Sequence, residues 1–176
     1  MNDKNLECSS GHRCEFIISA PSGAGKTTLF HQLKQMVSLE KVVSYTTRTR
    51  RQGENPGQDY HFVTIEQFRE KIKEDFFLEW ADVYGNYYGT PQSSSGTKAQ
   101  NLIYEVDVKG FISLRKYKSD ITSIFIAPPS VNVLRERLLK RQPAMPEHEL
   151  SRRLSCAQEE IQHASSYDYV ICNSEL

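Results

Sequence analysis

The stretch Ala20–Thr27 has the residue types and spacing in this chain that are best suited to chemistry. It reads Ala-Pro-Ser-Gly-Ala-Gly-Lys-Thr, between a short apolar run at 15–19 and apolar residues at helical spacing. Its glycines let the backbone turn so that several N–H groups point at one anion, and the helix that follows adds its dipole. The pattern predicts a nucleotide phosphate site, in which Lys26 reaches the β- and γ-phosphates and Thr27 holds Mg²⁺.

One position departs from the strict phosphate-loop pattern, because Ala20 stands where the first glycine is expected. The alternative is a glycine-rich turn that only joins a strand to a helix. The flanking strand and helix favour the phosphate site. The candidate nucleotide-binding residues are the loop and the start of the helix: Ala20, Pro21, Ser22, Gly23, Ala24, Gly25, Lys26, Thr27 and Thr28.

Composition narrows the class of protein. A chain of 176 residues suffices for one domain, and its 22 basic and 22 acidic side chains balance. The net charge therefore produces no overall electrostatic field that would favour nucleic acid or a membrane surface as a partner. Four cysteines without paired spacing suit a reducing compartment. The first residues lack the apolar core of a signal peptide, so we expect a cytoplasmic protein.

A run of guanidinium groups follows a strand predicted at 41–47. Arg48, Arg50 and Arg51 stand almost side by side, and arginine is the side chain shaped for bidentate phosphate contact. The alternative is a solvated basic turn. A strand at 60–63, a helix capped by Thr64 with Gln67, and strands at 76–84 and 87–90 are expected to follow. We therefore expect residues 44–90 to form a small, mostly β segment inserted after the first strand–helix unit.

The second half alternates strands and helices. A strand at 102–108 carries Asp107, which either assists Mg²⁺ beside the phosphate loop or faces solvent. A short helix at 111–117, a strand at 121–127 and a helix capped by Ser130 come next. A further arginine-bearing helix follows a proline break and forms either a lid over phosphates or an ordinary helical hairpin. With a last buried strand at 167–173, the pattern predicts an α/β fold with a parallel sheet between helices.

Several blocks of the sequence resemble guanylate kinases, over a region that runs from about Phe16 to the end of the chain. The phosphate loop alone indicates only a nucleotide, whereas the combination of blocks is specific. Alanine at position 20 is a common variant in that family. The matching blocks are Ser19–Thr27, Val43–Arg48, Gly57–Val63, Phe77–Ala81, Gly85–Thr90, Val106–Gly110 and Ile124–Ser130.

The resemblance implies a P-loop NTPase-type core with two attached parts. The core, expected at 15–43, 102–140 and 164–176, would bind ATP. A GMP-binding insertion is expected at 44–101 and a helical lid at 141–163, after a polar arm at 1–14. The implied activity is transfer of the γ-phosphate of ATP to GMP, and to dGMP as a second acceptor, with Mg²⁺. The implied protein is a monomer or weak homo-oligomer.

The resemblance also implies roles for single residues. The GMP phosphate would be held by Arg48, Arg51, Tyr60 and Tyr88. The guanine would be read by Ser44, Glu79, Thr90 and Asp107. The catalytic charges would come from Lys26, Arg48, Arg141 and, of the pair Arg152 and Arg153, from Arg153. Asn173 would lie near the adenine.

The chain departs from the family pattern at four places. Glu105 stands where aspartate is usual, Arg50 replaces a common proline, 91–101 is shorter and more polar than the family's helix, and relatives usually continue past Leu176 with one more helix. Two rival functions remain. A guanylate-kinase-like scaffold module would bind phosphorylated peptides, although such modules typically lose the phosphate loop. A kinase for another nucleoside monophosphate is disfavoured by Glu79 together with Ser44.

Overall fold

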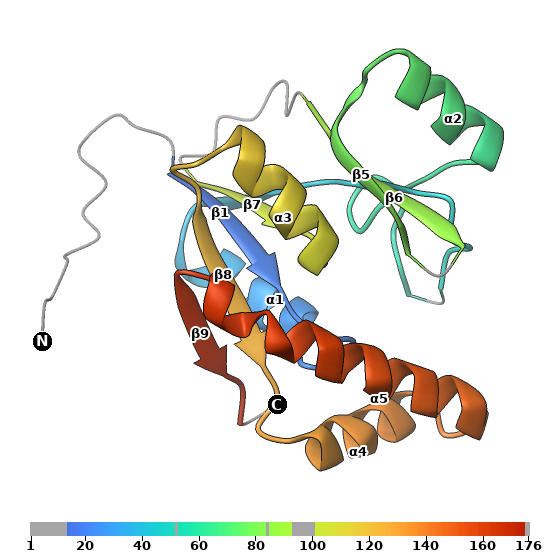
Figure 1. The fold of residues 1–176 in the computed structure, drawn as a ribbon, viewed down its shortest axis with the longest axis vertical. Helices are drawn as coiled ribbons and strands as arrows, with labels where there is room; N and C mark the ends of the chain where they lie inside the picture. The colour runs from blue at the N-terminus through green and yellow to red at the C-terminus, as the bar shows by residue number, and fades with distance from the viewer. Residues whose placement is uncertain (1–13, 52, 84, 93–100, 175–176) are drawn as a thin grey trace, which may run out of the picture.

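The computed structural model describes residues 14–51, 53–83, 85–92 and 101–174. The expectations for residues 1–13 of the polar arm and for 93–100 lie outside this part. A five-stranded sheet forms the core in the order β2-β7-β1-β8-β9, and every pairing in it is parallel. A separate four-stranded sheet has the order β4-β3-β6-β5 (Figure 1). The predicted α/β class is confirmed.

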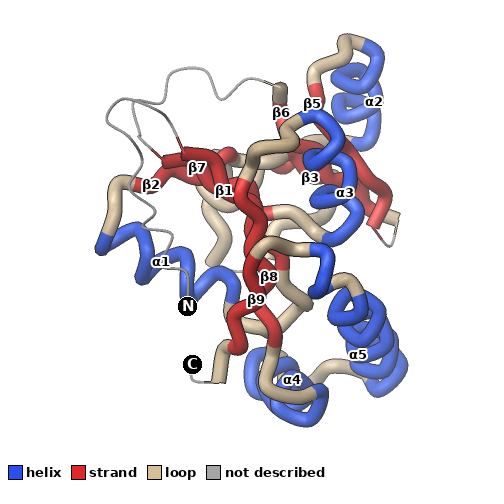
Figure 2. Tube along the Cα trace, turned by 60° about the vertical axis from the view of Figure 1, so that its left-hand side comes forward, coloured by secondary structure: helices blue, strands red, loops and turns tan. Residues whose placement is uncertain are grey.

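Alternating apolar residues in the core strands supply two hydrophobic faces. In β1 (Cys14–Ser19), Ile17 packs in the cluster with helix α3 (Val108–Tyr117), whereas Ile18 packs in the cluster with α1 (Lys26–Met36). The other core strands are β2 (Leu39–Val42), β7 (Asn101–Glu105), β8 (Thr122–Ala127) and β9 (Tyr169–Cys172). Figure 2 shows α1 and α3 on opposite sides of the sheet, as the sequence predicts.

The second sheet is an aromatic-rich unit built from the middle of the chain. Its strands are β3 (Tyr45–Thr46), β4 (His61–Phe62), β5 (Phe77–Val83) and β6 (Asn86–Pro91), with helix α2 (Ile65–Lys73) beside them. The Phe68 ring of α2 is fully buried and stacks on Phe77 and Tyr87. The predicted capping box of Thr64 and Gln67 is present.

Helices α4 (Val131–Arg141) and α5 (Glu147–Gln162) pack together through their own apolar cluster, which contains Leu134, Leu138 and Leu150. Ser130 caps α4, as predicted. The short 3₁₀ helix η1 (Ala164–Ser166) leads from α5 to β9. Figures 1 and 2 show the α4–α5 pair and the β5–β6 unit projecting to the same side of the core sheet.

Three strand predictions need correction. The predicted strand at 41–47 is two strands, because the chain leaves the core sheet after β2 and enters the second sheet at β3. The strand predicted to end at 108 ends at Glu105, since Asp107 caps a helix that already begins at Val108. The prediction of a buried last strand is wrong, because all four residues of the edge strand β9 are exposed.

Two further properties bear on the expected compartment. Within the described ranges, we find no helix with the length and apolarity needed to cross a membrane. Cys156 and Cys172 are free thiols, but Cys14 is disulfide-bonded, so the expectation of unpaired cysteines is wrong for Cys14.

Candidate active site

The phosphate loop joins β1 to α1 and leaves the start of α1 open. Gly23 and Gly25 have φ values of 94° and 95°, a region that L-side chains rarely adopt, and the Ala24 N–H donates to the Pro21 carbonyl at 3.0 Å. Helices α2, α3 and α4 are capped by side chains, whereas α1 begins after Gly25 with no side-chain cap among the described residues. Its first N–H groups and its dipole are therefore available to an anion.

Distant residues hold this loop in place. The Asn173 amide donates to the carbonyl of buried Ala24 at 2.8 Å. On the other side, a Cβ atom at Gly23 would lie 3.1 Å from Leu134 and Leu138 of α4. The loop is thus fixed by the end of the chain and by α4. A contact between Asn173 and adenine stays a prediction.

Charges of both signs surround the loop lysine. Burial alone would raise the pKa of Glu105, at the end of β7, but the charges of Lys26 and Lys41 lower it below its ordinary value. Among the described residues, no three His, Cys, Asp or Glu side chains gather into a metal site. The exposed Thr27 hydroxyl at the start of α1 fits Mg²⁺ that arrives with nucleotide phosphates.

A buried carboxylate lies where β5 and β6 meet α3. Glu79 pairs with Thr90 across the two strands and accepts a hydrogen bond of 2.6 Å from the Thr90 hydroxyl. Burial raises the pKa of Glu79 to about 7, and the charge of Asp107 adds to this, against the Thr90 hydrogen bonds. Glycine at position 110 allows the approach, because a Cβ there would lie 3.3 Å from both the Glu79 and the Asp107 carboxylates.

Asp107 and Ser44, the other two residues predicted to read guanine, have their own hydrogen-bond partners. The Asp107 carboxylate accepts a hydrogen bond from the Gly110 N–H at 2.8 Å and so caps α3. Ser44 is buried, and its carbonyl accepts from the His61 N–H at 2.9 Å. Glu79 comes from strand β5 of the second sheet and Asp107 from the cap of α3, and their carboxylates lie close together near the start of that helix.

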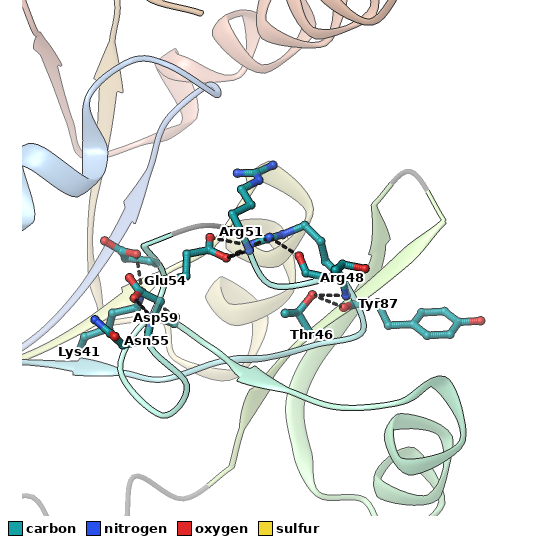
Figure 3. A network of polar contacts seen from close by, with 10 residues as sticks. Lys41, Thr46, Arg48, Arg51, Glu54, Asn55, Asp59 and Tyr87 are labelled. Atoms are coloured by element: carbon teal, nitrogen blue, oxygen red, sulfur yellow. Dashed lines mark hydrogen bonds and ion pairs between the residues drawn. The ribbon is translucent and has the colours of Figure 1, made fainter. Parts of the chain in front are cut away.

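The arginine run folds around a glutamate that the sequence analysis did not single out. Arg48 donates two hydrogen bonds to the Glu54 carboxylate, at 2.7 and 3.1 Å, and a third to the Thr49 carbonyl at 2.7 Å (Figure 3). Glu54 also accepts from the Arg51 N–H at 2.7 Å. In Figure 3 the Arg51 guanidinium points away from this network. Glu54 thus fixes the loop and leaves the Arg51 side chain directed elsewhere.

Two tyrosines lie next to the Arg48–Glu54 network. The Arg48 guanidinium lies 5.5 Å from the centre of the Tyr60 ring, and the Tyr60 and Tyr88 rings meet edge to face at 5.9 Å. Burial raises the pKa of Tyr60, so the phenol stays protonated at neutral pH and can donate a hydrogen bond to an anion. Three of the four predicted phosphate contacts, Arg48, Tyr60 and Tyr88, are therefore neighbours.

The arginines of the predicted lid approach the arginine loop. Loss of surrounding water lowers the pKa of Arg141, and the positive charges of Arg51 and Arg153 lower it further, against the charge of Glu54. Arg153 also forms an ion pair with Glu149 one turn away on α5. Three guanidinium groups from separate segments thus repel one another, and an anion between them would relieve this repulsion.

Comparison with known proteins places this arrangement in a family. The family model described as guanylate kinase matches residues 12–176. The chain is 45% identical over 165 residues to a guanylate kinase of Nitrosospira multiformis, covering 92% of the chain and 78% of that protein. A guanylate kinase of Carboxydothermus hydrogenoformans is 42% identical over 164 residues, covering 91% and 80%.

The chain belongs to the guanylate kinase family. The crystal structure of guanylate kinase from Anaplasma phagocytophilum has a TM-score of 0.72 and 32% identity, with 93% of this chain and 78% of that one covered. The P-loop NTPase-type fold is therefore confirmed. A second solved structure, TT1252 from Thermus thermophilus, shares the fold at 12% identity and a TM-score of 0.52.

For this guanylate kinase family member, the structure also contains polar residues near the site that the sequence analysis overlooked. Glu54 follows Arg51 by three positions in a glycine-rich loop, and this charge pattern would have been the signal. Lys41 had no local signal, because its partner Glu105 is distant in sequence. Glu160 of α5 has a pKa raised to about 7 by burial and by Asp107, against the charge of Lys26.

Proposed function

We propose that the protein transfers the γ-phosphate of ATP to GMP and, as a second acceptor, to dGMP. The core with its phosphate loop takes ATP, the 44–101 insertion takes GMP, and the 141–163 lid supplies arginines to the phosphates. The observation that carries the proposal is the buried Glu79 carboxylate, held by Thr90 close to Asp107. Family membership supports the same function.

Glu79 suits guanine because of the donor pattern of that base. The N1–H and the exocyclic N2 amine of guanine both donate, and one ionised carboxylate accepts both. The O6 atom accepts, which suits the hydroxyl of Ser44, whereas the Thr90 hydroxyl already donates to Glu79. Adenine reverses the donor and acceptor pattern on this edge, so Glu79 would face a lone pair. A buried site of this kind rejects the wrong base by about 10⁴-fold.

The transfer step requires positioning and charge neutralisation. Lys26 stabilises the charge on the transferred phosphate, and Arg48, Arg141 and Arg153 neutralise the oxygens between donor and acceptor. Thr27 would hold Mg²⁺ that arrives with the nucleotide phosphates, and the ion would supply further neutralisation of charge. Arg51, Tyr60 and Tyr88 hold the GMP phosphate in line. The protein contributes no covalent nucleophile in this scheme.

The same proposal fixes the class of partner. Free nucleotides are the substrates, nucleic acid and membrane play no part, and the protein works in the cytoplasm as a monomer or weak homo-oligomer. The scaffold alternative would have no use for a phosphate loop whose α1 N-terminus is left open. For that reason the enzyme is favoured over the phosphopeptide-binding module.

A coupled ADP-release assay with ATP tests the proposal across GMP, dGMP, AMP, CMP and UMP. We expect turnover with GMP and dGMP, and values of kcat/KM about 10⁴-fold lower for the other three. Lys26→Ala serves as the background control. Equal turnover of AMP or a pyrimidine would contradict the base assignment. No turnover by a folded protein that binds phosphopeptide would support the scaffold module instead.

A further inference from the structure

Lys41 lies where the core sheet meets the insertion, and nothing above gives it a role in the reaction. Its ammonium is 2.8 Å from the Glu105 carboxylate of β7 and donates to the Asp59 carbonyl at 3.0 Å. It also lies 5.1 Å from the centre of the Tyr60 ring. One cation therefore contacts a core carboxylate and two consecutive residues of the insertion.

Strand register explains how Lys41 reaches Glu105. In the parallel β2–β7 pair, Lys41 stands opposite Ile103, and Glu105 lies two residues further along β7. Side chains two residues apart share one face of a strand, so the two charges face the same side of the sheet. Their side chains are 11% and 7% exposed, which makes each charge costly without the other.

The pair also lies between the two halves of the proposed site. Glu105 is influenced by the charge of Lys26 in the phosphate loop as well as by Lys41. On the other side of Lys41, the Tyr60 ring also lies under the Arg48 guanidinium. Figure 3 shows Lys41, Asp59 and the Arg48–Glu54 pair in one region. A series of charged and aromatic contacts thus runs from Glu105, whose pKa the charge of Lys26 lowers, through Lys41 to the acceptor phosphate residues.

We propose that Lys41 is a positioning residue for the acceptor phosphate. By tying Asp59 and Tyr60 to Glu105, it holds the phosphate-binding part of the insertion at a fixed place relative to Lys26. The inference rests on the proposed function, because it assigns Tyr60 to the GMP phosphate. It predicts that Lys41 affects the binding of GMP but leaves the guanine pocket around Glu79 unchanged.

A second lysine offers a matched control for a purely structural ion pair. Lys118 forms an ion pair with Glu15 of β1 and lies 5.4 Å from the centre of the Tyr104 ring. It therefore repeats the ammonium, carboxylate and tyrosine arrangement of Lys41. Glu15 is near the start of β1, whereas the phosphate loop follows the end of that strand. Lys118→Met thus removes an ion pair of the same composition, although a more exposed one, away from the site.

The test compares Lys41→Met, Lys41→Arg and Lys118→Met by titrating GMP and guanosine in a calorimeter and by steady-state kinetics. Lys41→Met loses a hydrogen-bonded charge, so GMP binding should weaken about tenfold or more. The KM for GMP should rise by a similar factor. Guanosine binding and KM for ATP should stay unchanged. Lys41→Arg should recover most of the loss, and Lys118→Met should bind GMP like the wild type.

The double variant provides a second route if Lys41→Met folds poorly. Glu105→Gln should also weaken GMP binding. Adding Lys41→Met to Glu105→Gln should reduce GMP affinity little further, because the two side chains act as one unit. Equal loss of GMP and guanosine affinity, or equal effects of Lys41→Met and Lys118→Met, would overturn the inference. If the Lys41 variants change GMP binding as expected but the wild-type protein transfers no phosphate, the proposed function is refuted and the inference stands.

Discussion

The phosphate loop and the proposed GMP site in the insertion, here called the insertion pocket, are built in different ways. The loop is contiguous in sequence and presents backbone N–H groups at the start of α1, shaped by positive φ angles at Gly23 and Gly25. The pocket gathers side chains from separate strands and loops, and it includes the buried Glu79 and the Arg48–Glu54 pair. Backbone groups suit a phosphate that every nucleotide shares, whereas a buried carboxylate distinguishes one base from another.

This difference separates two kinds of sensitivity. Changes in the loop should affect transfer with any acceptor, since the donor phosphates are common to all reactions. Changes in the pocket should affect the choice of acceptor.

The largest effect is expected for Lys26→Ala in the loop. Removing the cation that stabilises the transferred phosphate should reduce kcat by at least about 10³-fold. The reduction should be the same for GMP and dGMP, because Lys26 does not meet the acceptor base. Steady-state kinetics with both acceptors measure it. A reduction confined to one acceptor would show that the loop takes part in acceptor recognition.

Glu79→Gln should act on the choice of base. It replaces an ionised acceptor by an amide that turns a donor toward guanine, which should cost about 2–4 kcal/mol in kcat/KM for GMP. The poor turnover of AMP should change little. The ratio of kcat/KM for GMP to that for AMP should therefore fall by about 30- to 1,000-fold.

Arg51→Ala is the control for this experiment. It removes a phosphate contact, so it should weaken both monophosphates alike and leave the ratio near its wild-type value. An unchanged ratio in Glu79→Gln would remove Glu79 from base recognition. A changed ratio in Arg51→Ala would show that phosphate binding and base reading are not separable here.

The same carboxylate should lower the stability of the free protein. The folded pKa of Glu79 is raised to about 7 from an ordinary 4.5, so the unfolded chain releases its proton first as pH rises. The free energy of unfolding therefore falls between about pH 4.5 and 7, by up to about 3 kcal/mol. Urea denaturation of Glu79→Gln should match the wild type near pH 5 and exceed it at pH 8. A constant difference between pH 5 and 8 would mean that Glu79 is ionised throughout.

The sequence predicted features that depend on neighbours along the chain. The phosphate loop, the Thr64 capping box and the Ser130 cap were all found, because each needs only a few consecutive residues. Features that depend on distant partners were missed. The break between β2 and β3 arises because the chain leaves the core sheet and enters the second sheet. Strand β9 lies exposed at the edge of the core sheet.

The candidate site divides in the same way. Family resemblance pointed to Arg48 and Glu79, and the structure places both beside other predicted contacts. Glu54 lies only six residues after Arg48, so its local charge pattern was a usable signal that was overlooked. By contrast, neither resemblance nor spacing indicated that Lys41 joins Glu105 to Asp59, because only the fold brings these residues together.

Calorimetric titration of GMP into Lys26→Ala and Glu79→Gln tests the division between loop and pocket most directly. If the loop serves ATP and the pocket serves GMP, Lys26→Ala binds GMP with the wild-type dissociation constant. Glu79→Gln should then bind it about 30-fold or more weakly. A comparable loss of GMP affinity in a folded Lys26→Ala variant, or wild-type affinity in Glu79→Gln, would contradict the account.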